Sequence, residues 1–331
     1  MAIRWGILGT GDIARLVAED LKLLPNADLT AVGSRSQDRA DAFGDAFDVP
    51  GRYGSYEALV TESDVDVVHV ATPHTSHAAD AKMAMNAGRA VLCEKPLAIN
   101  AREAASIVDC ARANDQFLME AMWTRFLPVI TDVRRLIVEE QALGDVLLMQ
   151  ADIGTRQPVD PGHRLFDPAL GGGALLDLGV YPIAFAFDLF GAPDEVRSSA
   201  VIGETGIDDQ CAAILDYEDG PQVVWSASLR VDAGRTCSIA GSRGRLHGTR
   251  AWWKGAPFVF TDEDGEETTW ARPYEGNGYQ FEASHVMRCL REGRSESPVM
   301  PLKETLSILE VTDALRAEWG VSYPGESADA S

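Results

Sequence analysis

Apolar residues in the first third of the chain fall into short runs that alternate with segments of helical periodicity. The runs predict strands, and the periodic segments predict helices. The predicted strands are 3–8, 28–33, 66–71, 90–93 and 117–120, and the predicted helices are 12–23, 37–46, 76–87 and 101–114. Strands that alternate with helices are typical of a parallel sheet covered by helices on both faces. We therefore predict an α/β domain with a doubly wound parallel sheet at residues 1–122.

Beyond residue 122 the apolar residues recur mainly with a period of two, as in antiparallel strands that bury one face. The predicted strands are 145–153, 195–202, 208–217, 222–231, 235–241 and 244–248, and the predicted helices are 127–139, 177–189, 279–291 and 303–318. The pattern predicts an α+β domain at residues 123–323 with a large, mostly antiparallel open sheet. The polar segment 324–331 is expected to be a disordered tail.

One strand of the second domain, 222–231, carries apolar residues in alternation that must be buried somewhere. These residues are Val223, Trp225, Ala227, Leu229 and Val231. The sequence does not decide whether they face helices of the same chain or the open side of the sheet. We expect a homodimer that forms through the open face of this sheet.

The chain has 331 residues, a hydrophobic content of 46% and a formal net charge of −22. This length suffices for two domains with separate cores. No apolar run approaches the roughly 20 residues that span a bilayer, and the first strand begins at once, so we expect no signal peptide and a cytoplasmic location. The negative charge disfavours nucleic acids and anionic membranes as partners, because both attract basic surfaces.

The cysteines and histidines do not predict a metal site. Five dispersed cysteines without a CxxC pair indicate reduced, mostly buried thiols; they are Cys93, Cys110, Cys211, Cys237 and Cys289. His74 and His77 have no further ligand at the spacing of a zinc site. We therefore expect no metal.

A glycine-rich turn joins the first predicted strand to the first predicted helix. Its residues are Gly9, Thr10, Gly11, Asp12 and Ile13. Such a turn lets backbone N–H groups approach a phosphate, which then lies at the positive end of the helix. Glycines also mark ordinary turns, but the strand before, the helix after and a further strand about 20 residues on favour dinucleotide binding. We assign Gly9 to the tight turn and Gly11 to the pyrophosphate, and predict a Rossmann domain.

The residues after the second strand bear on the choice of cofactor. An enzyme that prefers NAD usually has Asp or Glu there to accept hydrogen bonds from the ribose 2′-OH. This chain has Ser34 and Arg35 instead. A guanidinium binds a 2′-phosphate through paired N–H donors, whereas a carboxylate repels it. We predict NADP as the cofactor with NAD as a weaker substitute, although Arg35 is also compatible with a solvated loop charge.

Two more polar segments follow predicted parallel strands at their carboxyl ends, where open α/β sheets bind ligands. Thr72, Pro73 and His77 follow the third strand, and Glu94 and Lys95 follow the fourth. We assign all five to the cofactor site. A lysine in this place is able to reach both the nicotinamide ribose and a substrate, although Lys-Pro is also a common turn.

These segments together resemble the glucose–fructose oxidoreductase/inositol dehydrogenase (Gfo/Idh/MocA) family of two-domain, nicotinamide-dependent enzymes. The resemblance runs from residue 3 to about 320 and is carried by the glycine turn, 72–77, 94–96, 172–182 and 276–282. Within the family, segment 120–128 and Tyr181 look most like dimeric dihydrodiol dehydrogenases and NADP-linked D-xylose and other aldose 1-dehydrogenases. Many members have His where this chain has Tyr181.

The resemblance implies that Lys95, Asp177 and Tyr181 form the catalytic group. Asp177 and Tyr181 are four residues apart, so on a helix they share a face. A phenol with a pKa of about 10 is a poor base at neutral pH, and an adjacent ammonium favours the phenolate. Tyr181 would then exchange a proton with the substrate hydroxyl. The alternatives are a half-buried aromatic for Tyr181 and a helix N-cap for Asp177.

A further group of residues is assigned to the substrate. Aromatic and cationic residues follow the first domain and line either the substrate cleft or a packed interdomain contact. We assign the substrate to Lys95, Trp123, Phe126, Arg156, His163, Tyr181 and Tyr279. Trp123 and Arg125 are also assigned to the cofactor.

The resulting prediction is an NADP-dependent oxidoreductase that transfers hydride between NADP(H) and a polyol-like substrate. The resemblance implies an aldopyranose at C1 or a trans-dihydrodiol. The alternatives are a dinucleotide-sensing regulator without turnover and a glucose–fructose oxidoreductase-like enzyme with tightly held NADP. Intact Lys95, Asp177 and Tyr181 disfavour the regulator, and the lack of an export segment and N-terminal arm disfavours the second alternative.

Overall fold

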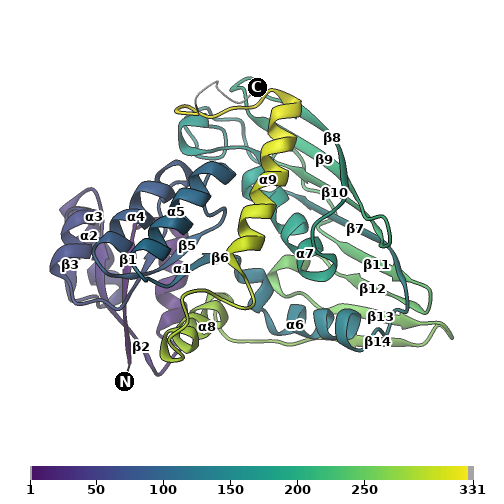
Figure 1. Ribbon diagram of the computed structural model, residues 1–331, viewed down its shortest axis with the longest axis horizontal. Helices are drawn as coiled ribbons and strands as arrows, with labels where there is room; N and C mark the ends of the chain where they lie inside the picture. The colour runs from purple at the N-terminus through teal and green to yellow at the C-terminus, as the bar shows by residue number, and fades with distance from the viewer. Residues whose placement is uncertain (1, 327–331) are drawn as a thin grey trace. The chain divides into compact units, whose positions relative to one another are not determined.

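The computed structural model describes residues 2–326, which form two compact units (Figure 1). The first unit contains the chain up to Trp123 and also Tyr274–Leu306, and the second contains Thr124–Pro273 and the chain from Ser307 onward. Of the expected disordered tail, residues 327–331 lie outside the described residues. Glu326 accepts hydrogen bonds from Arg316 at 2.9 Å, so the ordered chain extends beyond the predicted boundary at 323.

The first unit is built on a sheet of six parallel strands in the order β3-β2-β1-β4-β5-β6. The strands are β1 (Ile3–Leu8), β2 (Ala27–Gly33), β3 (Gly51–Tyr53), β4 (Val67–Val70), β5 (Ala90–Glu94) and β6 (Leu118–Ala121). The strand order reverses between β1 and β4, and ligands of open α/β sheets bind at the carboxyl ends of the strands at such a point. The predicted parallel sheet is confirmed, with β3 as an additional strand.

The helices of this unit begin and end close to their predicted positions. They are α1 (Asp12–Leu21), α2 (Gln37–Phe47), α3 (Tyr56–Glu62), α4 (His77–Asn86), α5 (Ala101–Ala113) and α8 (Tyr279–Arg291). Asn100 caps α5 because its side chain accepts a hydrogen bond from the Glu103 N–H at 2.8 Å, which satisfies an otherwise unpaired backbone donor. The pattern missed α3, which has only seven residues.

Helix α8 joins the first unit through one carboxylate on α1. Asp20 accepts hydrogen bonds from the backbone N–H groups of Asn277 and Tyr279, both at 2.8 Å. These donors lie at the start of α8, where helical N–H groups lack partners within the helix. Asp20 therefore connects α8 to α1 of the first unit, although about 250 residues separate the two helices in the sequence.

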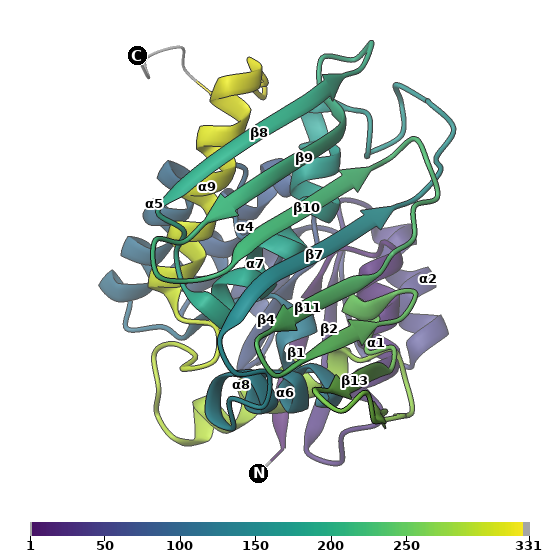
Figure 2. The same ribbon diagram turned by 90° about the vertical axis from the view of Figure 1, so that its right-hand side faces the viewer.

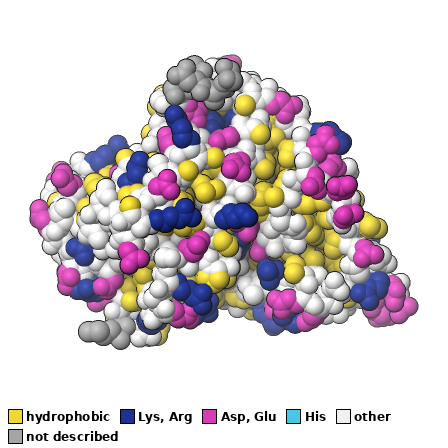
Figure 3. Space-filling view, viewed as in Figure 1, with side chains coloured by type: hydrophobic (Ala, Val, Ile, Leu, Met, Phe, Trp, Pro, Cys, Tyr) yellow, Lys and Arg dark blue, Asp and Glu magenta, His cyan; other side chains and the backbone are white. Residues whose placement is uncertain are grey.

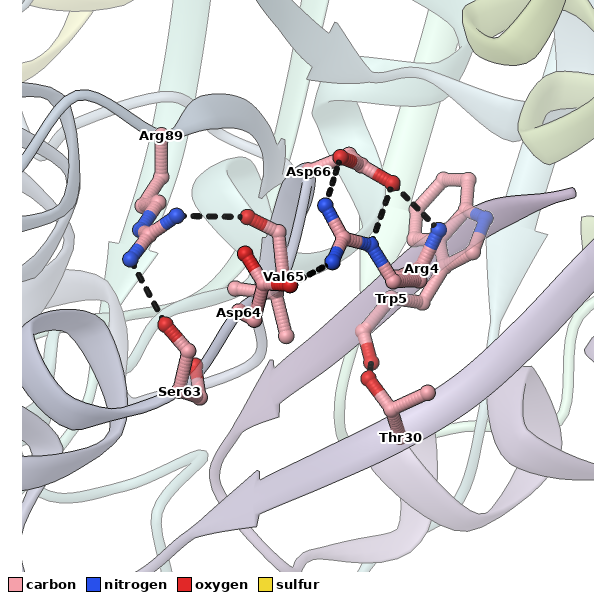
Figure 4. Close-up of polar contacts among 8 residues, drawn as sticks. All are labelled: Arg4, Trp5, Thr30, Ser63, Asp64, Val65, Asp66 and Arg89. Atoms are coloured by element: carbon pink, nitrogen blue, oxygen red, sulfur yellow. Dashed lines mark hydrogen bonds and ion pairs between the residues drawn. The ribbon is translucent and has the colours of Figure 1, made fainter. Parts of the chain in front are cut away.

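Charged residues hold the strands together at the amino end of the sheet (Figure 4). Arg4 donates hydrogen bonds to Asp66 from Nε at 3.1 Å and from Nη2 at 2.7 Å. The hydrogen bonds from Arg4 lower the pKa of Asp66. Arg89 donates to the carbonyls of Ser63 and Val65 at 2.6 and 2.9 Å. Because the glycine turn follows the carboxyl end of β1, this cluster lies at the other end of the strands. It fixes the strands relative to one another.

The second unit contains an eight-stranded sheet in the order β14-β13-β12-β11-β7-β10-β9-β8. The strands are β7 (Val146–Gly154), β8 (Glu195–Ile202), β9 (Asp208–Asp216), β10 (Gln222–Ser228), β11 (Cys237–Gly241), β12 (Gly244–Gly248), β13 (Phe258–Asp262) and β14 (Glu267–Trp270). All neighbours are antiparallel except β7 and β10. The predicted mostly antiparallel sheet is confirmed, and β13 and β14 extend it beyond the predicted strands.

Two predicted helices of the second unit each combine an α-helix with a π-helical turn. Helix α6 (Pro128–Arg134) continues into a π-helical turn at Arg135–Glu139, and a π-helical turn at Leu175–Gly179 leads into α7 (Val180–Phe190). Helix α9 spans Leu302–Trp319. The stretch Pro168–Phe190 is long and apolar enough to cross a membrane, with a mean hydropathy of 1.5, but 78% of it is buried within the protein. A core helix has this property too.

The alternating residues of the predicted strand 222–231 lie on the helix-covered face of the sheet, not on its open face. Val223, Trp225 and Ala227 are at most 2% exposed within the single chain. The strand ends at Ser228, and Val231 beyond it is 48% exposed. Figure 2 shows the sheet in front, with α7 behind it. Val223, Trp225, Ala227 and Leu229 are therefore core residues of the single chain and give no support to a dimer.

Candidate active site

The glycine turn between β1 and α1 has room for a ligand at one glycine and not at the other. Gly9 has a φ of +111°, and a Cβ there would come within 2.5 Å of the Ala71 carbonyl oxygen. Gly11 precedes α1, and no atom lies within 4 Å of the position that its Cβ would take. Packing thus requires glycine at position 9, while Gly11 leaves open space beside unpaired helical N–H groups. The turn fits a bound pyrophosphate.

Arg35 lies at the carboxyl end of β2 within a small polar cluster. Ser34 is 4% exposed, whereas Arg35 is exposed. Burial raises the pKa of the Tyr56 phenol, and Arg35 opposes this shift by its charge and by a hydrogen bond. Arg35 also acts electrostatically on Asp80, whose pKa is raised by burial. No acid occupies positions 34 and 35, the usual place of a carboxylate that binds a ribose diol.

His77 connects the loops that follow β4 and β5. It is fully buried, and its Nδ1 and Nε2 lie 2.9 Å from the carbonyl oxygens of Pro96 and Thr72. Burial lowers the pKa of its imidazole. Both ring nitrogens therefore meet backbone, and His77 fixes the two loops against each other. Its predicted contact with a cofactor stays a prediction.

The carboxyl end of β5 is buried and contacts a second histidine. Glu94 Oε1 lies 3.1 Å from His69 Nε2, and both residues are buried. Lys95 follows at the carboxyl end of the strand and is 8% exposed. The carboxyl end of β5 is thus followed by a nearly buried lysine, at the same end of the parallel strands as the glycine turn.

Two predicted substrate residues of the first unit meet although they are far apart in the sequence. The rings of Trp123 and Tyr279 are stacked, with centroids 4.8 Å apart and an interplanar angle of 28°. Trp123 follows β6, and Tyr279 is the first residue of α8, which Asp20 holds. Trp123 is 3% and Tyr279 is 7% exposed, so the stacked pair is buried, and its predicted contact with a substrate stays a prediction.

In the second unit, the predicted catalytic pair lies on the helical run that begins at Leu175. Asp177 lies within the π-helical turn, and its Oδ1 accepts a hydrogen bond from Arg164 Nη1 at 3.0 Å. The residues at the N-cap positions of the turn and of α7 are Ala174 and Gly179. The alternative reading of Asp177 as an N-cap is therefore wrong, and its carboxylate faces a guanidinium instead.

Tyr181 lies near an indole that the sequence analysis did not assign to the site. Its ring centroid is 6.4 Å from that of Trp253, and Tyr181 is 8% exposed. The Trp253 carbonyl accepts a hydrogen bond from Thr124 Oγ1 at 3.2 Å. Ala251, two residues earlier, has a φ of +66°. The tandem Trp252-Trp253 was the signal in the sequence, but nothing local linked it to Tyr181.

Of three other predicted site residues, one is buried and two are exposed. Arg125 is buried, and its Nη2 donates to the Ala184 carbonyl on α7 at 2.7 Å. Arg156 and His163 are exposed in the loop that follows β7, and His163 Nδ1 accepts a hydrogen bond from the Leu165 N–H at 3.3 Å. Arg125 thus supports α7, while the loop residues remain predictions.

Comparison with known proteins finds family models for both parts of the chain. The family model "Oxidoreductase family, NAD-binding Rossmann fold" matches residues 3–122, and "GFO/IDH/MocA C-terminal domain" matches 132–247. Trans-1,2-dihydrobenzene-1,2-diol dehydrogenase of Bos taurus is 35% identical over 98% of this chain and 99% of the relative. The Homo sapiens enzyme of the same name is also 35% identical over the same shares. The chain belongs to the Gfo/Idh/MocA oxidoreductase family. It is an oxidoreductase with an NAD-binding Rossmann domain, as predicted.

Solved structures of this fold agree over nearly the whole chain. KijD10, a 3-ketoreductase of Actinomadura kijaniata in complex with NADP and TDP-benzene, is 27% identical with a TM-score of 0.84, and covers 96% of this chain and 98% of its own. Aldose-aldose oxidoreductase of Caulobacter crescentus, complexed with glycerol, has a TM-score of 0.88 at 24% identity, and covers 97% of this chain and 98% of its own. The two-domain fold of the Gfo/Idh/MocA family thus extends over the whole described chain.

Proposed function

We propose that this chain is an NADP-dependent dehydrogenase of polyol-like substrates, either an aldopyranose oxidised at C1 or a trans-dihydrodiol. The observation that carries the proposal is Tyr181, a nearly buried phenol beside the Trp253 indole and one helical turn after Asp177. A phenol next to an indole ring suits a substrate that has both an alcohol group and a face of C–H groups. The names of the relatives, dihydrodiol dehydrogenase and aldose-aldose oxidoreductase, support the same class.

The cofactor is proposed to lie along the carboxyl edge of the first sheet. Gly11 and the N–H groups at the start of α1 would hold the pyrophosphate, and Arg35 would hold the 2′-phosphate. Thr72, Pro73 and Lys95 would border the nicotinamide end. When bound, NADP⁺ supplies the acceptor for the hydride.

Lys95, Asp177 and Tyr181 are proposed as the catalytic group. In the oxidative direction, the Tyr181 phenolate takes the proton of the substrate hydroxyl while the C–H bond of that carbon breaks with its electron pair and the carbonyl forms. Lys95 favours the phenolate by its positive charge, and Asp177 orients the group through its carboxylate. In the reverse direction Tyr181 returns the proton. Trp123, Phe126, Trp253 and Tyr279 are proposed to line the substrate.

A steady-state screen of aldoses, inositols and arene dihydrodiols with NADP⁺ tests the function. We expect turnover, followed by nicotinamide absorbance, with D-xylose, D-glucose or a trans-dihydrodiol. Turnover confined to a simple 2-hydroxy acid would contradict the substrate class. Tight NADPH binding without turnover of any compound would favour a dinucleotide-sensing regulator instead.

Replacing Arg35 by Ala is expected to lower the preference for NADP over NAD. A hydrogen bond to a charged group contributes about 1.5–3 kcal/mol, so the ratio of kcat/KM values should fall roughly ten- to hundredfold. Arg112→Ala is the control, because it removes an exposed positive charge of the same unit that pairs with Asp109. Equal kcat/KM for the two cofactors in the wild type, unchanged in Arg35→Ala, would show that Arg35 does not select NADP.

We also propose a homodimer that forms through the open face of the second sheet. By strand register, this face carries Leu148, Val224 and Ile214 on neighbouring strands, all partly exposed, and Ala212 beside them is exposed. Apolar side chains that gather on a sheet face favour protein contacts. Light scattering at micromolar protein is expected to give twice the chain mass. A stable monomer would contradict the proposal, and Leu148→Lys with Val224→Lys should dissociate the dimer.

Other partners and the compartment are proposed from composition. Figure 3 shows acidic and basic side chains interspersed over the face in view, and the net charge is −22. This surface suits small-molecule substrates rather than nucleic acids or anionic membranes. The five cysteines are free, and four of them are buried, which suits a reducing cytoplasm.

A further inference from the structure

A buried carboxylate on β9 holds the start of the helical run that carries Asp177 and Tyr181. Asp208 is 0% exposed, and its Oδ2 accepts a hydrogen bond from the Leu175 N–H at 2.6 Å. Leu175 is the first residue of the π-helical turn that leads into α7. Backbone N–H groups at a helix start lack partners within the helix and carry partial positive charge. A carboxylate there both pairs a donor and matches the charge.

The turn before this helix is shaped around the same carboxylate. Gly173 has a φ of +129°, and a Cβ there would collide with Asp208 Oδ1. The Gly173 carbonyl accepts from the Asp177 N–H at 3.3 Å, and the Gly172 carbonyl accepts from the Tyr323 hydroxyl at 2.7 Å. The position of Asp177 is thus linked through the turn to Asp208.

The surroundings of Asp208 shift the pKa of its carboxyl group in both directions. Burial raises its pKa to about 7, and the hydrogen bonds from the Leu175 N–H and from the Cys211 thiol, together with the charge of Arg316 on α9, oppose the shift. Burial and the nearby Asp208 raise the pKa values of Cys211 and Tyr323, so both stay neutral. Arg316 is itself paired with Glu326 and Asp313.

We propose that Asp208 is a positioning residue for Tyr181: its carboxylate anchors the first N–H of the helical run and thereby fixes where the phenol stands. This rests on the proposed function, in which Tyr181 exchanges the proton. Asp208 lies 33 residues from Leu175 in the sequence and carries no catalytic motif of its own. Its charged form gives the stronger hydrogen bond to the Leu175 N–H. Activity should therefore fall as the pH drops through the titration of Asp208.

The test compares Asp208→Ala and Asp208→Asn with Asp209→Asn. Asp209 is a matched control because it is 3% exposed, follows directly in β9 and pairs with Arg230 at 2.5 Å. For Asp208→Ala we expect kcat to fall at least about tenfold, since small displacements of a reacting group cost up to about 10²-fold, while the Kd for NADPH stays unchanged. Asp209→Asn should keep the wild-type kcat.

The pH profile separates positioning from mere support of the fold. In the reductive direction, in which Tyr181 must carry its proton, the wild-type kcat should show an acid limb near pH 7, where Asp208 takes up its proton, and Asp208→Asn should lose that limb and stay at the low-pH rate. The stability should move in the opposite direction. Because the folded state binds the proton more tightly than the unfolded state, the wild type should lose stability relative to Asp208→Asn as pH rises from about 3.8 to about 7.

Hydrogen exchange in residues 172–181 gives a readout that does not need turnover. We expect faster exchange there in Asp208→Ala and Asp208→Asn than in Asp209→Asn. If Asp208→Ala fails to fold, the Asn variant decides. Wild-type kcat and an intact acid limb in Asp208→Asn would overturn the proposal. If the wild type turns over no compound, the proposed function fails separately, and unchanged exchange in both Asp208 variants would then overturn the anchoring as well.

Discussion

Removing the phenolic oxygen in Tyr181→Phe is expected to lower the rate of hydride transfer by about 10²–10⁴, the usual range for a lost proton-transfer group. Phe keeps the aromatic ring, whose centroid lies 6.4 Å from that of Trp253. The fold and the packing of the two rings should therefore persist. The Kd for NADP⁺ should barely change, because the phenol does not hold the cofactor. Single-turnover measurements with saturating NADP⁺ report the chemical step directly.

Tyr217→Phe is the matched control for this change. Tyr217 lies in the same unit, and its hydroxyl donates to the Gly191 carbonyl just after α7 at 3.1 Å. Its loss removes a phenolic hydrogen bond close to the same helix without touching the proposed chemistry. A Tyr181→Phe variant that kept more than about a third of the wild-type rate, where at least a 10²-fold loss is required, would show that Tyr181 is not the base. His163 would then be the next residue to test.

Most of the fold follows from local patterns, which is why the sequence predicted it. The runs that became β1, β2, β4, β5 and β6 are apolar because both faces of a parallel sheet are covered. The three residues of β3 and the seven of α3 are too short to show a period. Strand β14 is mostly exposed at the sheet edge, so its residues do not alternate in polarity.

The site could be predicted from the sequence where a functional residue and the structural elements that position it lie in one short segment. The glycine turn has its strand, its helix and its open Gly11 within residues 3–21. Trp253 and Asp208 could not be assigned in this way, because each meets the catalytic helix only through folding. The same holds for α8. It belongs to the first unit and its start is bound by Asp20, although all strands of the second sheet lie between α1 and α8 in the sequence.

Lys95→Ala is expected to reduce both the rate and the affinity for the cofactor. Lys95 is 8% exposed and directly follows β5, where a nicotinamide ribose would lie, and its charge is proposed to favour the Tyr181 phenolate. A hydrogen bond to a charged group contributes about 1.5–3 kcal/mol, so the Kd for NADP⁺ should rise roughly ten- to hundredfold. The rate at saturating cofactor should fall by about 10²–10⁴.

This double loss distinguishes Lys95 from Tyr181, whose replacement should affect the rate alone. Lys82→Ala is the control, because Lys82 lies in α4 of the same unit and donates to Ser106 Oγ at 3.2 Å. Lys95→Arg keeps the charge but not the compact ammonium, so it should retain more cofactor affinity than rate. If Lys95→Ala lost affinity but kept its rate, the lysine would only hold the ribose and would not assist the proton transfer proposed for Tyr181.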